Sequence, residues 1–321
     1  MSISDREPVI EARSLRKLFG EVLAVDDVSF GVAPGQVLGL LGPNGAGKTT
    51  VIRMLTTLTS IGAGSASIAG CDVAAEPESV RSLIGLAGQA AAVDEKLSAR
   101  ENLQLFARLY KLPRAIRRRR VGELIDRFDM GEFAERPAST YSGGQRRRLD
   151  IVAALVAEPV ALFLDEPTTG LDPRSRAEVW ESIRSLAAEG TAIVLTTQYL
   201  EEADQLAHEI LMIDRGRTVA SGSPETLKKT VGSDVLQIRV AGDVDLVTTQ
   251  ALLGCDSVVD VDSHRVDVPI TGGARQSLAV LRRLEDLDVA IADFQLRRPT
   301  LDDAFLTLTG APASEQQELD Q

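Results

Sequence analysis

The chain has 321 residues, enough for about two domains, and its 44% hydrophobic and 26% charged residues are ordinary for a globular protein. This composition excludes a long disordered chain, and the formal net charge of −12 argues against broad binding to nucleic-acid phosphates. Two cysteines and two histidines are too few for a disulfide framework or for a Cys- or His-rich metal site.

No targeting or membrane-spanning segment is visible in the sequence. Residues 1–10 are polar and acidic where a signal peptide needs an apolar stretch. The longest apolar runs fall far short of the roughly 18 residues that a membrane span requires. We therefore expect a cytosolic, soluble chain.

Short apolar runs alternate with helical patterns through the first 220 residues or so. The runs that predict buried strands are Val37–Leu41, Val160–Leu164, Ala192–Leu195 and Glu209–Ile213. The segments between these runs have helical spacing, for example Ala177–Ala188. Strands that alternate with helices indicate an α/β domain with a largely parallel sheet.

The stretch from about residue 94 to 157 interrupts this alternation with a helical pattern throughout. Ser98 and Glu101 form a predicted capping box, and Val121, Leu124, Ile125 and Phe128 lie on one apolar stripe. The simplest interpretation is a helical insertion in the α/β domain.

Beyond about residue 230 the composition becomes acidic, with 16 Asp/Glu and 7 Lys/Arg in residues 231–321. The predicted strands are Val235–Val240, Val266–Val268 and Val289–Phe294, and the predicted helices are Gln250–Leu253 and Leu278–Leu284. We expect a small α+β domain over residues 232–310 and a flexible tail over residues 311–321.

A phosphate-binding motif follows the first predicted strand directly. Residues Gly42-Pro43-Asn44-Gly45-Ala46-Gly47-Lys48-Thr49 match G-x-x-x-x-G-K-[ST] in a strand–loop–helix context. Glycines let the backbone wrap a triphosphate, and the helix N-terminus adds a positive field. Lys48 is predicted to reach the β- and γ-phosphates, and the Thr49 hydroxyl is predicted to bind Mg²⁺.

Two adjacent carboxylates, Asp165 and Glu166, end the strand predicted at Val160–Leu164. A pair of acids leaving a buried strand is costly without a cation or a reacting partner. Asp165 therefore suits Mg²⁺, and Glu166 suits the activation of a water molecule.

A third motif, Tyr141-Ser142-Gly143-Gly144-Gln145, precedes a predicted helix. Ser142 and Gln145 by themselves could form a routine capping box. The two glycines weaken a helix start unless something approaches their backbone, so we interpret this N-terminus as a second anion site.

In these motifs the sequence resembles the ATP-binding subunits of ABC transporters over roughly residues 7–225. The resemblance implies a P-loop NTPase fold of the ABC ATPase type, with a mixed sheet core and a helical subdomain at about 94–157. It implies ATP and Mg²⁺ as cofactors, and it assigns ATP contacts to Phe19, which stacks on adenine, and to Gly42, Pro43, Asn44, Gly45, Ala46, Gly47, Lys48, Thr49 and Thr50. The resemblance assigns Mg²⁺ binding to Thr49, Gln89 and Asp165. It assigns contacts with the ATP of a second subunit to Ser142, Gly143, Gly144, Gln145 and Asp172.

More narrowly, the chain resembles ATPases of daunorubicin-resistance drug exporters. The residues that carry this resemblance are 141–150, 171–175, 195–204 and 298–305. Gln198 stands where most ABC ATPases have a histidine at the γ-phosphate, so catalysis is assigned to Glu166 and Lys48 with Gln198. An amide can donate a hydrogen bond but cannot become a cation.

This resemblance implies a head-to-tail pair of ATPase subunits on separate transmembrane permease subunits, peripheral at the cytoplasmic face of the membrane. Efflux of a hydrophobic drug or lipid-like compound is the function it favours. An importer ATPase, and an ABC ATPase acting on nucleic acid or ribosomes, remain as alternatives.

Two basic runs, Arg117–Arg120 and Arg146–Arg148, have no role in these motifs. We interpret both first as solvated helix faces, with contact to anionic lipid or to a permease as the alternative.

Overall fold

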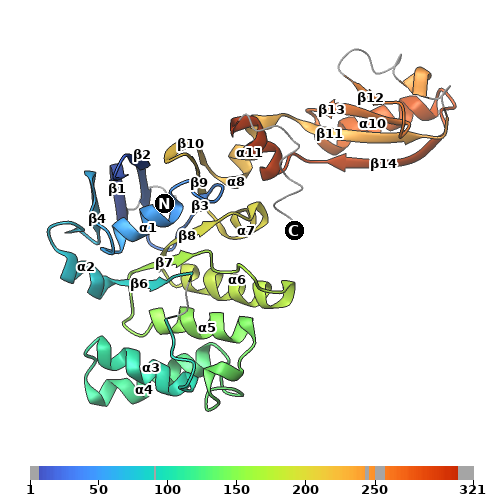
Figure 1. Cartoon of the computed structure of the whole chain (residues 1–321). Helices are drawn as coiled ribbons and strands as arrows, with labels where there is room; N and C mark the ends of the chain where they lie inside the picture. Colours follow the sequence, from blue (N-terminus) through green and yellow to red (C-terminus); the bar gives the residue numbers. More distant parts are fainter. Residues whose placement is uncertain (1–6, 90–91, 243–245, 250–256, 310–321) are drawn as a thin grey trace. The chain divides into compact units, whose positions relative to one another are not determined.

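The computed structural model describes residues 7–89, 92–242, 246–249 and 257–309 (Figure 1). The chain divides into two compact units, Met1–Pro224 and Glu225–Gln321. The helix predicted at Gln250–Leu253 and the tail predicted at 311–321 lie outside the described residues.

A six-stranded sheet forms the centre of the first unit, in the order β10-β9-β3-β8-β7-β6. Its strands are β3 (Val37–Leu41), β6 (Ile84–Ala87), β7 (Ala161–Asp165), β8 (Ala192–Thr197), β9 (Glu209–Asp214) and β10 (Arg217–Gly222). All neighbours are parallel except β10, which runs antiparallel to β9. The predicted strands are therefore confirmed, and the sheet is mixed as expected.

A second, antiparallel sheet was not predicted from the sequence. It has the order β2-β1-β4-β5 and comprises β1 (Ile10–Phe19), β2 (Val22–Val32), β4 (Ala63–Ile68) and β5 (Cys71–Asp72). Residues of β1, β2 and β4 share one hydrophobic cluster with α1 (Lys48–Leu55) and with one face of the six-stranded sheet. The helix that follows the Gly-rich loop thus packs between two sheets.

Alternate residues of the central strands serve opposite faces. In β7, Ala161 and Phe163 pack in the cluster around α1, whereas Leu162 and Leu164 pack in the cluster of the other face. Because both faces are covered, the strand is apolar from Ala161 to Leu164, which explains the continuous run in the sequence.

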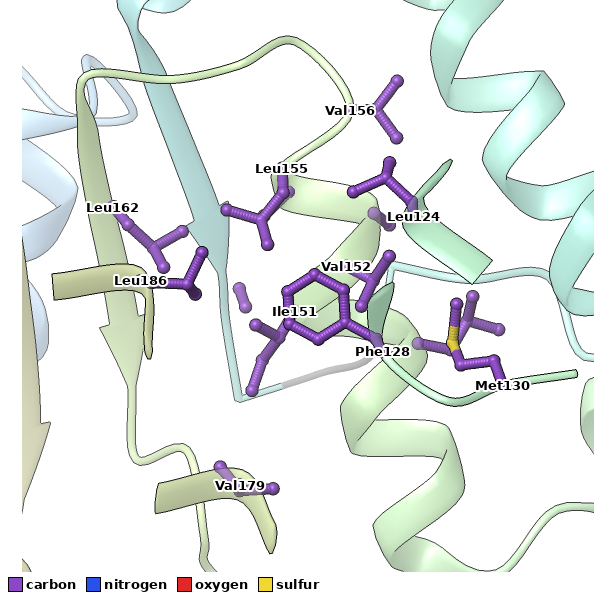
Figure 2. Packing of buried hydrophobic residues seen from close by; sticks show 14 of the residues in the cluster. Leu124, Phe128, Met130, Ile151, Val152, Leu155, Val156, Leu162, Val179 and Leu186 are labelled. Carbon is purple, nitrogen blue, oxygen red and sulfur yellow. The ribbon is translucent and has the colours of Figure 1, made fainter. Parts of the chain in front are cut away.

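The other face carries the remaining large helices of this unit. They are α3 (Ala99–Leu109), α4 (Arg114–Arg127), α5 (Gly143–Ala154), α6 (Pro173–Ala188) and α7 (Leu200–Leu206), with α2 (Pro77–Leu83) leading into β6. Figure 2 shows side chains of α4, α5, β7 and α6 meeting in one cluster, so α5 lies between the sheet and the outer helices.

The helical insertion is confirmed as α3, α4 and α5, but it is not helical throughout. Residues 128–142 form turns and the 3₁₀ helix η2 (Ala138–Thr140). The predicted capping box opens α3, where the Glu101 amide donates to Ser98 Oγ and the Ser98 amide donates to Glu101 Oε2. None of the helices in the described part of the chain has the length and hydrophobicity needed to cross a membrane.

The second unit holds a four-stranded antiparallel sheet in the order β12-β13-β11-β14. Its strands are β11 (Asp234–Val240), β12 (Val258–Asp260), β13 (Arg265–Ile270) and β14 (Ile291–Arg297), and its helices are α10 (Gly273–Glu285) and α11 (Leu301–Thr309). With the helical residues 246–249 between β11 and β12, the chain order from β11 to β14 is that of a split β-α-β fold. The helix α8 (Pro224–Val231) precedes it.

The predicted last strand is displaced along the sequence. β14 begins at Ile291, two residues after the predicted start, because Val289 packs in the core as the chain leaves α10. This unit is an α+β structure with its own hydrophobic cluster, separate from the two clusters of the first unit.

Candidate nucleotide and hydrolysis site

The loop from Gly42 to Thr49 connects β3 to α1 and needs glycine at particular points. Gly47 has φ +106°, and a Cβ there would lie 2.4 Å from the Ala24 carbonyl oxygen. A Cβ on Gly42 would lie 2.1 Å from the Ile213 carbonyl oxygen. Only glycine therefore fits at both ends of this loop, which is the backbone arrangement that a polyphosphate requires.

Lys48 is buried at the start of α1. Its Nζ donates to the carbonyl oxygens of Gly42 at 2.6 Å and Pro43 at 3.0 Å, which holds the ammonium against the loop. Burial lowers the pKa of Lys48, while the charges of Glu166 and Asp165 act in the opposite direction. A cation with only carbonyl partners and nearby carboxylates is well suited to an incoming phosphate oxygen.

The end of β7 brings Asp165 against α1. Thr49 Oγ1 donates to Asp165 Oδ1 at 3.0 Å, and Thr196 Oγ1 donates to the same oxygen at 2.5 Å. A hydroxyl and a carboxylate in contact, both beside the loop, form an oxygen donor set that fits Mg²⁺. Thr49 and Asp165, two of the residues that the sequence predicts to bind Mg²⁺, therefore lie in contact.

Glu166, the next residue, has φ +50°, a left-handed conformation that is rare for a non-glycine residue. Its amide donates to Thr196 Oγ1 at 3.0 Å, and its carboxylate lies 3.4 Å from Thr169 Oγ1. Thr196 was missed by sequence reasoning because only the pairing of β7 with β8 places it there.

Nine of the predicted site residues line a cavity of about 180 Å³. It is lined by Ala24, Asn44, Gly45, Ala46, Gly47, Lys48, Thr49, Thr50, Gln89 and Glu166. The loop, the predicted magnesium ligand Gln89 and the predicted base Glu166 thus face one space, although they are far apart in the sequence.

Phe19 and Gln198 do not line this cavity, and neither do Gly42, Pro43 and Asp165. Phe19 is half-exposed near the end of β1, with the Lys17 ammonium 5.3 Å from its ring centroid. Gln198 follows β8, and its Oε1 is buried without a hydrogen-bond partner among the described residues. The Oε1 atom of Gln198 is therefore available to accept a hydrogen bond. Gln198 lies two residues after Thr196, which bonds Asp165.

The motif at 142–145 opens α5 at a different place. Ser142 and Gln145 form a reciprocal capping box, with amide-to-side-chain distances of 3.2 Å in both directions. A Cβ on Gly144 would lie 2.4 Å from Ser175 Oγ, so a close neighbour in the same chain already requires this glycine. Sequence reasoning attributed the glycine pair to an anion alone, and missed this packing.

Asp172 begins the neighbouring helix α6, where its carboxylate accepts from the Ser175 amide at 3.0 Å. This bond lowers the pKa of Asp172. Ser175 therefore joins the cap of α6 to the glycines that open α5. None of the residues that line the 180 Å³ cavity comes from Ser142–Gln145 or is Asp172.

A second cavity, of about 480 Å³, lies between these elements. It is lined by Gln89, Gly143, Arg146, Arg147, Asp150, Glu166, Thr169, Gly170 and Leu171. Gln89 and Glu166 line both cavities, so they connect the Gly-rich loop with the start of α5.

The interpretation of Arg146–Arg148 as a solvated helix face is wrong. The Arg147 side chain is only 11% exposed and pairs with Asp150, Arg148 pairs with Glu178, and Arg146 pairs with Glu95. All three guanidinium groups form ion pairs, because other elements cover α5 on both sides. Asp150, three residues after Arg147, was the available signal, since that spacing places both on one helix face.

The first basic run is only partly solvated. Arg120 is largely buried, where it donates to the Leu155 carbonyl oxygen at 2.8 Å and pairs with Glu158. Arg119, by contrast, is exposed and pairs with Glu123 along the same helix.

Comparison with known proteins shows the family of this chain. The family model described as ABC transporter matches residues 25–169. The daunorubicin resistance ATP-binding protein DrrA2 of Streptomyces coeruleorubidus is 48% identical, over 94% of this chain and 95% of that protein. The Nod factor export ATP-binding protein I of Ralstonia nicotianae is 39% identical, over 94% of each chain.

A solved structure described as the ATP-binding subunit of an ABC transporter matches with a TM-score of 0.62 and 29% identity, over 69% of this chain and 92% of that one. The fold expected from the motifs is thereby confirmed, as is an ATPase of the transport type. The chain belongs to the ATP-binding proteins of the ABC transporter family, and it is similar to the drug-resistance type over nearly its whole length.

Proposed function

We propose that this chain hydrolyses ATP as one half of a head-to-tail dimer and thereby powers efflux of a hydrophobic drug or lipid-like compound. The membrane path belongs to separate permease subunits, and the chain acts at the cytoplasmic face of the membrane as a peripheral subunit. The names of the relatives, resistance to daunorubicin and export of Nod factor, support export over import.

One observation supports the proposed head-to-tail dimer. Residues 44–49 of the loop, Gln89 and Glu166 line one cavity, whereas none of Ser142–Gln145 at the start of α5 lines it. A helix N-terminus with free backbone amides attracts phosphate, and this one has no residue in the lining of the cavity at the loop. A second copy in head-to-tail orientation supplies that helix start to the nucleotide of the first.

Each residue of the site has a distinct task in this mechanism. The glycine backbone and Lys48 bind the phosphates, and Thr49 and Asp165 hold Mg²⁺, with Gln89 facing the same cavity. When bound, Mg²⁺ neutralises charge on the phosphate oxygens. Glu166 orients the attacking water and accepts its proton, a contribution of about 10²- to 10⁴-fold in rate.

The Gln198 amide completes the polar surround of the phosphates in this proposal. Its buried oxygen without a partner supports an open acceptor role, which the attacking water can fill, whereas the amide nitrogen is the group that can donate to a phosphate oxygen. Because an amide does not titrate, the proton transfer remains with Glu166.

Lys48→Ala tests the binding site. Loss of the buried ammonium should weaken ATP binding by about ten- to hundredfold, the range for hydrogen bonds to charged groups. Equilibrium binding of a fluorescent ATP analogue measures it. Lys96→Ala, which removes an exposed lysine, is the matched control and should bind normally. Unchanged affinity in Lys48→Ala would exclude the loop as the phosphate site.

Glu166→Gln tests hydrolysis and the dimer together. The variant keeps the shape of the side chain but cannot accept a proton, so it should bind ATP, lose about 10²-fold or more in kcat, and accumulate as a dimer. Size-exclusion chromatography with and without ATP reports the dimer. A variant that stays monomeric with near-normal turnover contradicts both roles.

The exported compound is tested with the permease present. ATPase activity of the reconstituted complex in vesicles should rise with anthracycline drugs and not with small hydrophilic nutrients. Stimulation by a nutrient taken up into the cell would favour the importer alternative instead.

A further inference from the structure

Arg147 and Asp150 form a buried ion pair to which the ATP-binding motifs assign no role. They lie on one face of α5, a turn beyond the helix start at Ser142, and Arg147 Nη1 is 3.2 Å from Asp150 Oδ2. Their side chains are 11% and 2% exposed. A buried pair of this kind is expensive to desolvate, so its retention needs a reason beyond stability.

Arg147 bonds the backbone on both sides of Glu166. Arg147 Nε donates to the Pro167 carbonyl oxygen at 2.8 Å, and Nη2 donates to the Asp165 carbonyl oxygen at 3.2 Å. These two carbonyls belong to the residues immediately before and after Glu166. A residue with φ +50° persists only where its surroundings hold it, and the guanidinium grips the backbone on both sides of it.

Arg147 and Asp150 also bond backbone groups close to Gln89 in the sequence. Arg147 Nη1 donates to the Gly88 carbonyl oxygen at 2.6 Å, and the Ala92 amide donates to Asp150 Oδ1 at 2.9 Å. Gly88 and Ala92 stand on either side of Gln89 in the sequence. The arginine therefore bonds the residue just before Gln89, and the aspartate bonds a residue three positions after it.

We infer that Arg147 and Asp150 act as one clamp that positions Gln89 and Glu166 relative to each other and to the start of α5. The inference rests on the proposed function, because the clamp affects hydrolysis through Gln89 and Glu166, which face the ATP held by the Gly-rich loop. Neither residue lines the cavity around the Gly-rich loop, so both are positioning residues. Only a planar fork with several N–H groups can serve three carbonyls and a carboxylate at once, which a lysine cannot do.

Arg147→Lys is the decisive variant, because it keeps the charge and removes the fork. Misplacing a reacting group by about 1 Å costs about 10²-fold. We expect kcat for ATP to fall about ten- to hundredfold while KM changes less than about threefold, since the phosphate loop is untouched. Fluorescence of Trp180, the single tryptophan of the chain, reports that the variant is folded.

Arg120→Lys is the matched control. Arg120 is a similarly buried arginine that bonds a carbonyl and a carboxylate, but its partners Leu155 and Glu158 lie outside the site. It should keep kcat within about twofold of the parent chain, so a loss specific to Arg147→Lys is not a general cost of replacing a buried arginine.

Asp150→Asn is the second variant and carries the test if Arg147→Lys does not fold. The amide oxygen still accepts from Ala92, but the ion pair is lost, so kcat should fall with little change in KM. Combined with Arg147→Lys, it should cost no more than the arginine change alone, because residues that act as one unit are non-additive. Multiplied losses in the double variant would show two separate roles.

The outcomes separate the two levels of the argument. A parent chain without ATPase activity overturns the proposed function. A parent chain that is active, with Arg147→Lys and Asp150→Asn both folded and both at parental kcat, overturns the clamp alone. A rise in KM with unchanged kcat also overturns it, because that pattern belongs to a binding residue.

Discussion

At the scale of single residues, buried polar groups of the first unit gather around the strand ends of the central sheet. Glu202 is an example, because its carboxylate accepts from Thr168 Oγ1 at 2.8 Å and from Trp180 Nε1 at 3.1 Å. Burial raises the pKa of Glu202, and the hydrogen bonds and the charge of Arg176 only partly oppose the effect. Arg147 is a second cation near enough to interact with it.

This raised pKa predicts a pH-dependent stability. The folded chain holds the Glu202 proton more tightly than the unfolded chain does, so stability is lost as pH rises from about 4.5, the ordinary glutamate value, through the raised value. Glu202→Gln keeps an acceptor oxygen and removes the titration. Its free energy of unfolding relative to the parent should therefore increase with pH, by about 1.4 kcal/mol for each unit of pKa shift.

Urea unfolding followed by circular dichroism at several pH values measures this difference. Glu201→Gln, on the same helix but exposed, keeps the buried carboxylate, and the loss with rising pH should persist in it. A difference between Glu202→Gln and the parent that does not vary with pH would contradict the prediction.

At the scale of elements, two helices of the same subdomain open with the same device. α3 begins with the Ser98–Glu101 capping box, and α5 begins with the Ser142–Gln145 capping box. The sequence patterns are nearly alike, yet only the second helix start carries the glycine pair and borders the 480 Å³ cavity. Capping chemistry therefore gives local stability in both helices, and the function proposed for α5 is additional.

This pair of caps allows a matched comparison. Ser98→Ala and Ser142→Ala should each reduce the free energy of unfolding by about 1 kcal/mol, the usual cost of losing an N-cap side chain. Only Ser142→Ala should also reduce kcat, because its helix start binds the partner's nucleotide in the proposed dimer. Chemical denaturation and steady-state ATPase assays measure the two effects. Equal kcat in both variants would reduce Ser142 to a helix cap.

At the scale of the whole molecule, the chain contains two units with separate cores. The first unit holds every residue of the proposed site, and the second holds a four-stranded sheet around Leu236, Ile238 and Val266. Because each unit has hydrophobic clusters of its own among the described residues, each should unfold as its own cooperative transition.

Calorimetry of the full chain with the Glu166→Gln change tests this prediction. ATP at about 100 times its Kd should stabilise the first unit by about 2.7 kcal/mol and leave the transition of the second unit in place. Ile238→Ala, at a fully buried position, should lower only the second transition, by about 2–5 kcal/mol. The exposed-site control Val258→Ala should shift neither. A single transition that moves with both changes would contradict two independent units.

Much of the fold was predictable because its signals are local. Strands such as β3 and β7 are buried on both faces and therefore read as continuous apolar runs. The antiparallel sheet was missed because β1 and β2 alternate between buried and exposed residues and contain register shifts, which weaken the pattern. The helical subdomain was recognised, but its irregular segment between α4 and α5 was not.

The candidate site divides in the same way. Lys48 and Thr49 were identified from the Gly-rich motif that follows β3, and Asp165 and Glu166 were identified as adjacent acids at the end of β7. Thr196 was not, because it reaches Asp165 only through the pairing of β8 with β7. Arg147 was misjudged as solvated because its burial depends on carbonyls of Gly88, Asp165 and Pro167, which lie up to 59 residues away in the sequence.

The sequence by itself determined the chemistry of this protein. A Gly-rich loop, two carboxylates after a strand and a second glycine-bearing helix start are local patterns whose spacing follows from backbone geometry. The tertiary structure alone decided how these parts are held: which carbonyls surround Arg147, which hydroxyls meet Asp165, and which side chain touches Gly144. The reason is physical, since hydrogen bonds between distant backbone groups depend on strand order and helix packing, and no short stretch of residues encodes either.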